Sequence, residues 1–209
     1  MRYSKEHKIE THARIVTKAA TRLREKGLHG VGVADLMKDA GLTHGGFYAH
    51  FESREALVIE AFSQTMDASI RSWRDSVKDM PPDERLAQLV GNYLTARHRD
   101  TPARGCAVPT LGPDVVRESP KTRRAFAGKV EEMIDGIAAF LPDVSPEEAK
   151  RQAIVALSTM IGTLLLSRVA GTGQLSDDIL KTGRETVNAK SARTSTMPGR
   201  SKAPGVSSS

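Results

Sequence analysis

The chain has 209 residues, of which 39% are hydrophobic and 27% charged, a balance typical of an ordinary soluble protein. It has no run of about 20 apolar residues to span a bilayer, and its N-terminal segment lacks the apolar stretch of a secretory signal. A single cysteine, Cys106, excludes an internal disulfide framework. We therefore expect a cytoplasmic protein with no membrane partner.

Positive charge is concentrated in the first quarter of the chain. Residues 1–54 contain ten Lys or Arg, six Asp or Glu, and five of the six histidines, within a chain whose formal net charge is +6. A basic, histidine-rich segment suits a polyphosphate partner such as DNA. A solvated helix face would have the same composition, so charge alone leaves both interpretations open.

Apolar residues recur with the 3.6-residue period of α-helices, and sustained period-2 alternation does not appear. The pattern predicts helices over about 9–26, 33–40, 43–51, 53–78, 84–94, 120–140, 146–170 and 176–190. Within 101–113, three prolines and two glycines allow only a short or broken helix. We expect Thr43, Ser53 and Asp83 to cap the helices that follow them. The predicted fold class is all-α, with about nine helices.

Three parts are expected along the chain. Residues 1–52 form a short three-helix head, and residues 53–190 form a larger helical body. Residues 191–209 have three basic residues, no acids and almost no apolar content, so we expect a disordered tail.

The stretch GLTHGGFYAHF, residues 41–51, combines two adjacent glycines with three aromatic residues. Each glycine costs about 1 kcal/mol relative to Ala inside a helix. Residues 33–51 nevertheless have the outline of a helix-turn-helix. Phe47 and Phe51 lie one turn apart and are expected to bury against Ile9, Val16 and Leu36.

The remaining side chains of the second helix are then expected to point away from the core. They are Thr43, His44, Tyr48 and His50, whose hydroxyls and imidazoles are suitable ligands for phosphates and base edges. Gly45 and Gly46 would remove side chains where the backbone approaches DNA. The alternative is a buried helix whose glycines allow close packing against a neighbour.

The full string GLTHGGFYAHFESREALVIEAF, preceded by VGVADLMKDA, resembles the TetR/AcrR family of one-component regulators. The family pattern is Gly-Val-Ser/Thr-x-Gly-small-Leu/Phe-Tyr-x-His-Phe-x-Ser/Asn-Lys/Arg-Glu-x-Leu. It is matched here by Gly41, Thr43, Gly45, Gly46, Phe47, Tyr48, His50, Phe51, Ser53, Arg54, Glu55 and Leu57. The resemblance is close over residues 8–68 and loose as far as residue 190.

The resemblance implies a DNA-binding transcriptional regulator, a repressor released from a palindromic operator by a small molecule, electrophile or oxidant. It implies that Tyr48, His50 and Arg54 contact phosphates, while Thr43 and His44 lie nearest base edges. Two departures from the pattern matter: Gly32 replaces a capping Ser or Thr, and Gly46 and Ala34 replace polar base-reading side chains of some members. No catalytic residue, cofactor or metal site is expected.

The body is expected to make a homodimer. Helix 146–170 is apolar on more than one face, and a helix apolar all round is buried all round. Ser158 and Gly162 are small and would let a second helix approach, with Leu166 and Val169 on the same side. The resemblance implies that the last two helices form a four-helix bundle across a twofold axis. The alternative is a central helix in the core of a monomer.

Cys106 lies in the proline-rich stretch ARGCAVPTLG, close in sequence to Arg97, His98, Arg99 and Arg104. Nearby cations lower the pKa of a thiol, which predicts a partly exposed thiolate. The Arg-Gly-Cys also resembles the TetR-family group that senses electrophiles, exemplified by the repressor of N-ethylmaleimide reductase. The alternatives are a buried packing residue or, for the whole protein, a cysteine-dependent hydrolase using His98. An architectural DNA-binding protein is the other rival function.

Overall fold

The computed structural model describes residues 5–142 and 144–195. This part of the chain contains nine α-helices, two short 3-10 helices and no strand, which confirms the all-α prediction. The elements in chain order are α1 (Lys5–Lys26), α2 (Val33–Asp39), η1 (His44–Ala49), α3 (Arg54–Val77), α4 (Pro82–Tyr93), α5 (Ala96–Asp100), η2 (Pro102–Arg104), α6 (Val108–Val115), α7 (Pro120–Ala138), α8 (Pro146–Val169) and α9 (Gln174–Ser195).

Local sequence signals explain most helix ends. Gly27 and Gly41, which follow α1 and α2, adopt φ angles of 77° and 74°, a left-handed conformation that favours glycine. The Ser53 hydroxyl caps α3 by accepting a hydrogen bond from the Ala56 N–H at 3.1 Å. The Asp83 cap is wrong, because α4 begins at Pro82. Proline lacks the N–H that a helix cannot use at its first position, and its φ angle is already helical.

The segment 101–113 is broken as predicted. It contains the single turn η2 and then α6, separated by the loop at Gly105. The last helix is longer at both ends than the predicted 176–190, since α9 begins at Gln174 and extends to Ser195. The rest of the predicted tail, residues 196–209, lies outside the described residues.

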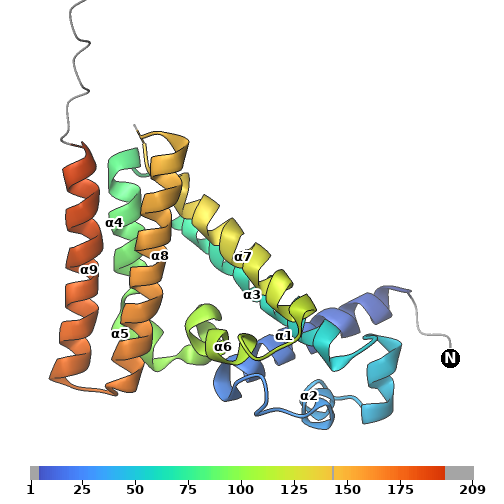
Figure 1. The fold of residues 1–209 in the computed structure, drawn as a ribbon. Coiled ribbons are helices and arrows are strands. Elements are labelled where there is room, and N and C mark those ends of the chain that lie inside the picture. Colours follow the sequence, from blue (N-terminus) through green and yellow to red (C-terminus); the bar gives the residue numbers. More distant parts are fainter. Residues whose placement is uncertain (1–4, 143, 196–209) are drawn as a thin grey trace, which may run out of the picture.

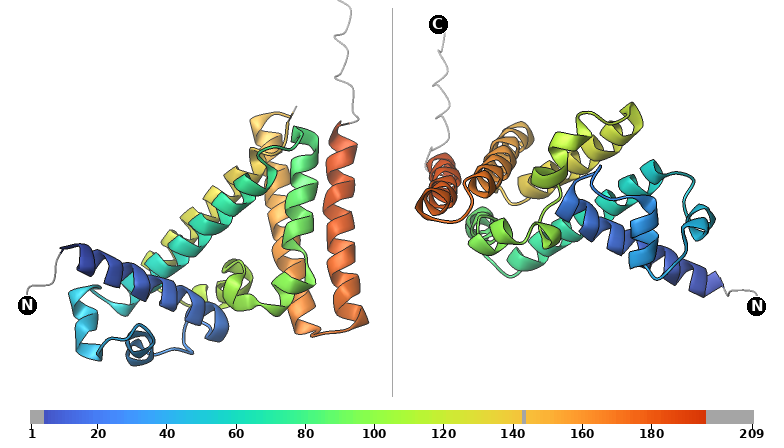
Figure 2. Two further views of the ribbon diagram at one scale, coloured as in Figure 1. Left: turned by 180° about the vertical axis from the view of Figure 1, so that it is seen from behind. Right: turned by 90° about the horizontal axis from the view of Figure 1, so that it is seen from below.

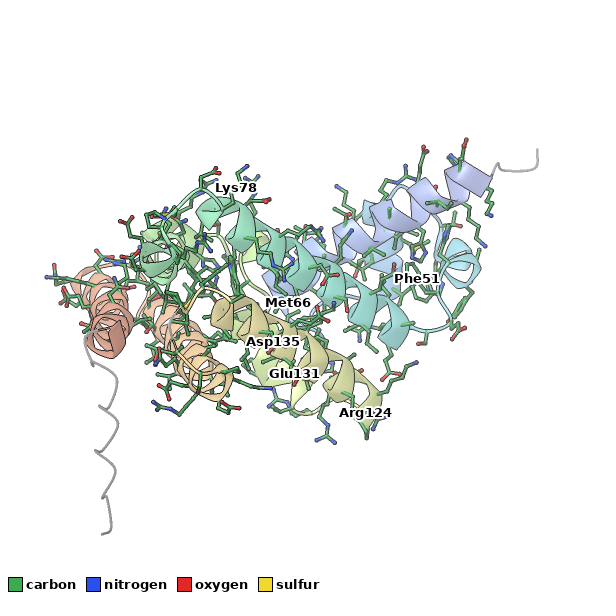
Figure 3. The ribbon with its side chains drawn as sticks, turned by 90° about the horizontal axis from the view of Figure 1, so that it is seen from above. Phe51, Met66, Lys78, Arg124, Glu131 and Asp135 are labelled. Carbon is green, nitrogen blue, oxygen red and sulfur yellow. The ribbon has the colours of Figure 1, made fainter. Side chains whose placement is uncertain are left out.

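The helices form a head at one end and an upright group at the other (Figure 1). The head contains α1, α2 and η1, whereas α4, α8 and α9 stand together at the opposite end. Helices α3 and α7 pack along each other and connect the two groups. Figure 3 shows this span, with Phe51 at the head end and Lys78 at the other end of α3. The buried side chains form one continuous apolar cluster from Ile15 to Val187.

Phe47 and Phe51 of the stretch 41–51 are buried, as predicted, with their rings stacked at a centroid distance of 5.4 Å. Val16 and Leu36 belong to the same core. Ile9, however, is 61% exposed, so its predicted place in this core is wrong. The imidazole of His12, one turn further along α1, stacks on Phe51 at 4.4 Å and covers that ring instead.

Candidate nucleic-acid interface

The second element of the helix-turn-helix is a 3-10 helix, η1, and not the α-helix predicted through Phe51. Thr43 precedes it with extended backbone, but its hydroxyl makes no capping hydrogen bond. Thr43 therefore occupies the predicted N-cap position, although its side chain does not form the capping hydrogen bond. Two adjacent glycines lower α-helix propensity at this end, and short 3-10 turns are common where α-helical geometry is weakly favoured. The Thr43 hydroxyl is therefore not used for helix capping.

Neither glycine of η1 is required by the packing of the protein itself. A Cβ added at Gly45 would meet nothing within 4 Å, and one added at Gly46 would lie 3.7 Å from the Met37 Cε atom, an ordinary contact. Neither residue is among the glycines with positive φ. This removes the alternative in which the glycines serve close packing inside the chain. The packing of the subunit therefore leaves the backbone of both glycines without a close neighbour.

Three side chains of the motif are presented to solvent. Thr43 and His44 are exposed, and Tyr48 is 71% exposed although it is a large aromatic residue. The rings of His44 and Tyr48 meet edge to face, with centroids 6.5 Å apart. Tyr48 also meets the buried Phe47 edge to face at 5.3 Å. The polar groups of Thr43, His44 and Tyr48 thus face solvent, and the Tyr48 ring packs on the buried Phe47.

His50 is placed differently from the other three. It is half-buried, and its Nδ1 atom is shielded from solvent without a hydrogen-bond partner among the described residues. Burial lowers the pKa of His50, and the charges of His12 and Lys8 lower it further. At neutral pH the ring is uncharged, so any phosphate contact would be a neutral hydrogen bond.

Arg54 connects the start of α3 to the loop after α1. Its guanidinium donates a hydrogen bond to the Leu28 carbonyl. The Leu28 N–H in turn donates to the Asp114 carboxylate of α6 at 2.8 Å. Arg54 therefore has a structural contact besides the predicted phosphate contact, and α6 of the body touches the head through Leu28.

Cys106 is buried, with 4% of its surface exposed, so the expected partly exposed thiolate is wrong for this structure. Burial raises the pKa of the Cys106 thiol, although Arg168 and Arg24 act in the opposite direction. The cations nearest in sequence are not among the groups that lower this pKa. Arg99, for example, is itself buried and pairs with Asp100 and Asp177, each at 2.7 Å.

His98 is a structural group beside Cys106. Its Nε2 accepts the Cys106 backbone N–H at 2.9 Å, and its Nδ1 lies 2.7 Å from the Tyr93 carbonyl, to which it must donate. Burial lowers the pKa of His98, in agreement with the neutral ring that this pattern requires. Both ring nitrogens are bonded to backbone, so the arrangement offers no support for a thiol hydrolase. The described residues also contain no group of three or more His, Cys, Asp or Glu that could hold a metal ion.

One face of α8 is apolar and uncovered. Ile154, Leu165, Leu166 and Val169 are exposed, the last two by 58% and 78%, and Ser158 lies exposed among them. This exposure within one subunit argues against the alternative of a central helix in the core of a monomer. Helices α8 and α9 stand at the end farthest from the head, and no other described element lies beyond them (Figure 2).

Helix α8 is also long and apolar enough to cross a membrane by length and composition alone. Core helices of soluble proteins share those properties, so this observation is weak by itself.

Comparison with known proteins identifies the head. Residues 15–61 match the profile of bacterial regulatory proteins of the tetR family. The chain is a TetR-family transcriptional regulator. The match spans α1, α2, η1 and the first turns of α3, which are the elements that carry the exposed motif.

Similarity to known proteins extends beyond the head. The uncharacterized helix-turn-helix-type regulator Rv0196 of Mycobacterium tuberculosis is 26% identical over 164 residues, covering 75% of this chain and 83% of the relative. A TetR transcriptional regulator from Chloroflexus aurantiacus superposes with a TM-score of 0.74 at 21% identity, covering 90% and 97% of the two chains. The reduced form of NemR from Escherichia coli gives a TM-score of 0.71 at 17% identity, covering 84% and 96%. At these identities, the structural matches support the fold.

Sequence reasoning missed the arginines that the fold gathers near Cys106. Arg24 of α1 donates to the Ala103 carbonyl at 2.8 Å and to the Thr65 hydroxyl, and Arg168 of α8 donates to the His98 carbonyl at 2.8 Å. Both come from helices remote in sequence from Cys106. No periodicity or motif in the sequence indicates that these arginines lie near Cys106, because their positions depend on how α1, α3 and α8 cross.

Proposed function

We propose that this TetR-family regulator binds a palindromic operator as a homodimer and represses transcription until a ligand in the body releases it. Such a regulator acts in the cytoplasm, where it meets DNA. Residues 1–52 then form the DNA-binding head, and residues 53–190 form the regulatory and dimerisation domain. The observation that carries the proposal is the surface of η1, where exposed polar side chains surround two glycines that the subunit itself does not need.

Each residue of the motif has a role in this proposal. Tyr48 and Arg54 contact phosphates, and His50 adds a neutral contact from its half-buried position. Thr43 and His44 reach base edges, while Gly45 and Gly46 let the backbone approach the groove. Phosphate contacts position a protein on the duplex, whereas base contacts specify the sequence.

The uncovered face of α8 supports the homodimer. We assign Ser158, Gly162, Leu166 and Val169 to the interface, because contiguous exposed apolar surface marks an interaction site. A Cβ at Gly162 would meet nothing within 4 Å inside the subunit. A twofold dimer places two heads on one side and matches the symmetry of a palindromic site.

A physical connection from body to head is available for release. Asp114 of α6 accepts the Leu28 N–H, and Arg54 beside the motif donates to the Leu28 carbonyl. A ligand that moves α6 would therefore disturb the loop against which α3 and the head are fixed. Coupling of about 1–3 kcal/mol is typical of allosteric proteins and would be enough for release.

The test is selection of genomic DNA fragments by the purified protein, followed by footprinting of the selected fragments. One protected palindrome per fragment supports the proposal, whereas uniform coating would indicate an architectural DNA-binding protein. Tyr48→Phe should weaken binding to all sequences similarly and reduce the salt dependence, because it removes a phosphate contact. His44→Ala should instead change the preferred bases. The role assignments are wrong if these two outcomes are exchanged.

A further inference from the structure

A cavity of about 720 Å³ lies against Cys106, and helices α1, α3, α4 and α5 contribute to its walls. Its volume falls within the range of about 300–1,000 Å³ that small-molecule sites occupy. Four arginines line it: Arg24, Arg71, Arg97 and Arg104. No Asp or Glu is among the described residues that line the cavity.

This charge pattern distinguishes the cavity from two smaller cavities on the same chain. The cavity of about 330 Å³ beside α1 and α2 contains Lys18 and Arg22 together with Glu25 and Asp39. The one of about 350 Å³ between α3 and α7 also contains acids, among them Glu132 and Asp135. Figure 3 shows Glu131 and Asp135 along α7. Acids line both smaller cavities beside their cations, whereas no acid lines the large cavity, although Arg71 borders both it and the cavity of about 350 Å³.

Arg24 gives the strongest indication of a missing partner. Its guanidinium is partly buried and bonds only to neutral acceptors, the Ala103 carbonyl and the Thr65 hydroxyl. Burial lowers the pKa of Arg24, which means that its surroundings disfavour the charge. Buried charges are ordinarily paired, because desolvation costs several kcal/mol per ion. Glu25 interacts with this charge from the next position in the chain, but both hydrogen bonds of the Arg24 guanidinium go to neutral acceptors. A bound anion would supply a directly bonded counter-charge.

The remaining walls favour a compact ligand. Ser69, Ser72 and Ser76 line the cavity from one face of α3, so this wall is polar and unsuited to a long acyl chain. On the inner side, Trp73 and Tyr93 meet edge to face with centroids 6.2 Å apart. The buried Tyr93 hydroxyl interacts with the Cys106 thiol and has no nitrogen or oxygen partner among the described residues.

We propose that this cavity binds a compact organic polyanion, a small molecule with two or more carboxylate or phosphate groups, and that Arg24 and Arg104 recognise its charges. This inference rests on the proposed function, because it names the chemical class of the ligand that releases the operator. Arginine is well suited to the role, since its planar fork binds carboxylates and phosphates through two parallel hydrogen bonds.

The experiment is isothermal titration calorimetry of the full chain at constant ionic strength. The probes are citrate and fructose 1,6-bisphosphate, with triethyl citrate and fructose as their uncharged counterparts. We expect one polyanion to bind with one site per subunit and its uncharged counterpart not to bind. The two arms distinguish a carboxylate ligand from a phosphate ligand. Failure of both polyanions to bind at millimolar concentration would overturn the proposal.

Matched variants separate the cavity from the basic head, which could also attract anions. Arg104→Gln removes an exposed lining cation, and Arg74→Gln removes an exposed cation of α3 that does not line this cavity. We expect Arg104→Gln to weaken polyanion binding about tenfold, as for a lost hydrogen bond to a charged group. Arg74→Gln should leave it within about twofold, since surface charges are largely screened. Equal binding by both variants would place the anion elsewhere and refute the assignment.

DNA binding without any added ligand is measured on the same preparations. A protein that selects an operator but ignores both polyanions refutes this inference and leaves the proposed DNA-binding function intact. A protein that binds a polyanion but selects no operator refutes the proposed function instead.

Discussion

The two glycines of η1 allow folding and DNA binding to be separated by single substitutions. In Gly45→Ala, the new Cβ meets nothing within 4 Å, and in Gly46→Ala it lies 3.7 Å from Met37 Cε. Neither change creates a clash in the subunit. Replacing glycine by alanine in a regular helix stabilises by about 0.5–1 kcal/mol, which is an upper limit for a short 3-10 helix. We therefore expect unchanged or slightly raised stability.

In contrast, Gly45→Ala and Gly46→Ala should both lower the affinity for DNA. If the bare backbone of η1 lies against the duplex, each added methyl group overpacks a close contact. Overpacking costs about 1–3 kcal/mol, which corresponds to a loss of about 5- to 150-fold in affinity. The assays are urea unfolding for stability and fluorescence anisotropy with a selected operator for affinity.

Gly41→Ala is the control, because Gly41 also has open space around its Cβ position but adopts a φ angle of 74°. Alanine there should destabilise the chain by about 1–2 kcal/mol, the cost of a left-handed conformation for a residue with a Cβ. The reasoning is refuted if Gly45→Ala and Gly46→Ala unfold as readily as Gly41→Ala. It is equally refuted if both keep full operator affinity.

Three further predictions concern the body. Gly162→Leu should weaken dimerisation, because overpacking costs about 1–3 kcal/mol and acts twice across a twofold axis. The measurement is analytical ultracentrifugation. Gly128→Leu is the control, because Gly128 also has open space around its Cβ position, and this variant should remain dimeric. Cys106 should react with N-ethylmaleimide far more slowly in the folded chain than in the urea-unfolded chain, because the thiol is buried and its pKa is raised. Mass spectrometry measures the two rates, and equal rates would contradict the burial of Cys106. Because burial lowers the pKa of His98 below its ordinary value, the stability that its neutral ring contributes is complete above about pH 6.5 and is lost as pH falls through the folded-state pKa. His98→Gln should therefore lose less unfolding free energy than wild type between about pH 7.5 and 5.5, and an unchanged slope would remove His98 as a cause.

The sequence by itself determined the helical class, most helix positions and the DNA-binding motif. These are encoded locally: apolar period, glycine at helix ends and the Ser53 cap all act within a few residues. The same locality explains the buried Phe47 and Phe51, whose one-turn spacing places them on one face. It also explains the error at Asp83, because the proline that precedes it begins the helix one residue earlier than predicted.

Only the tertiary structure decided the environment of groups whose neighbours come from distant helices. Sequence proximity to arginines suggested a reactive Cys106 thiolate, but burial outweighs those charges and raises the pKa of the thiol. Arg24 and Arg168 approach Cys106 from α1 and α8, far away along the chain. Desolvation and charge interactions depend on distance in space, which a linear pattern does not contain. For the same reason, the cavity that collects Arg24 and Arg104 without an acid became visible only once the helices were packed.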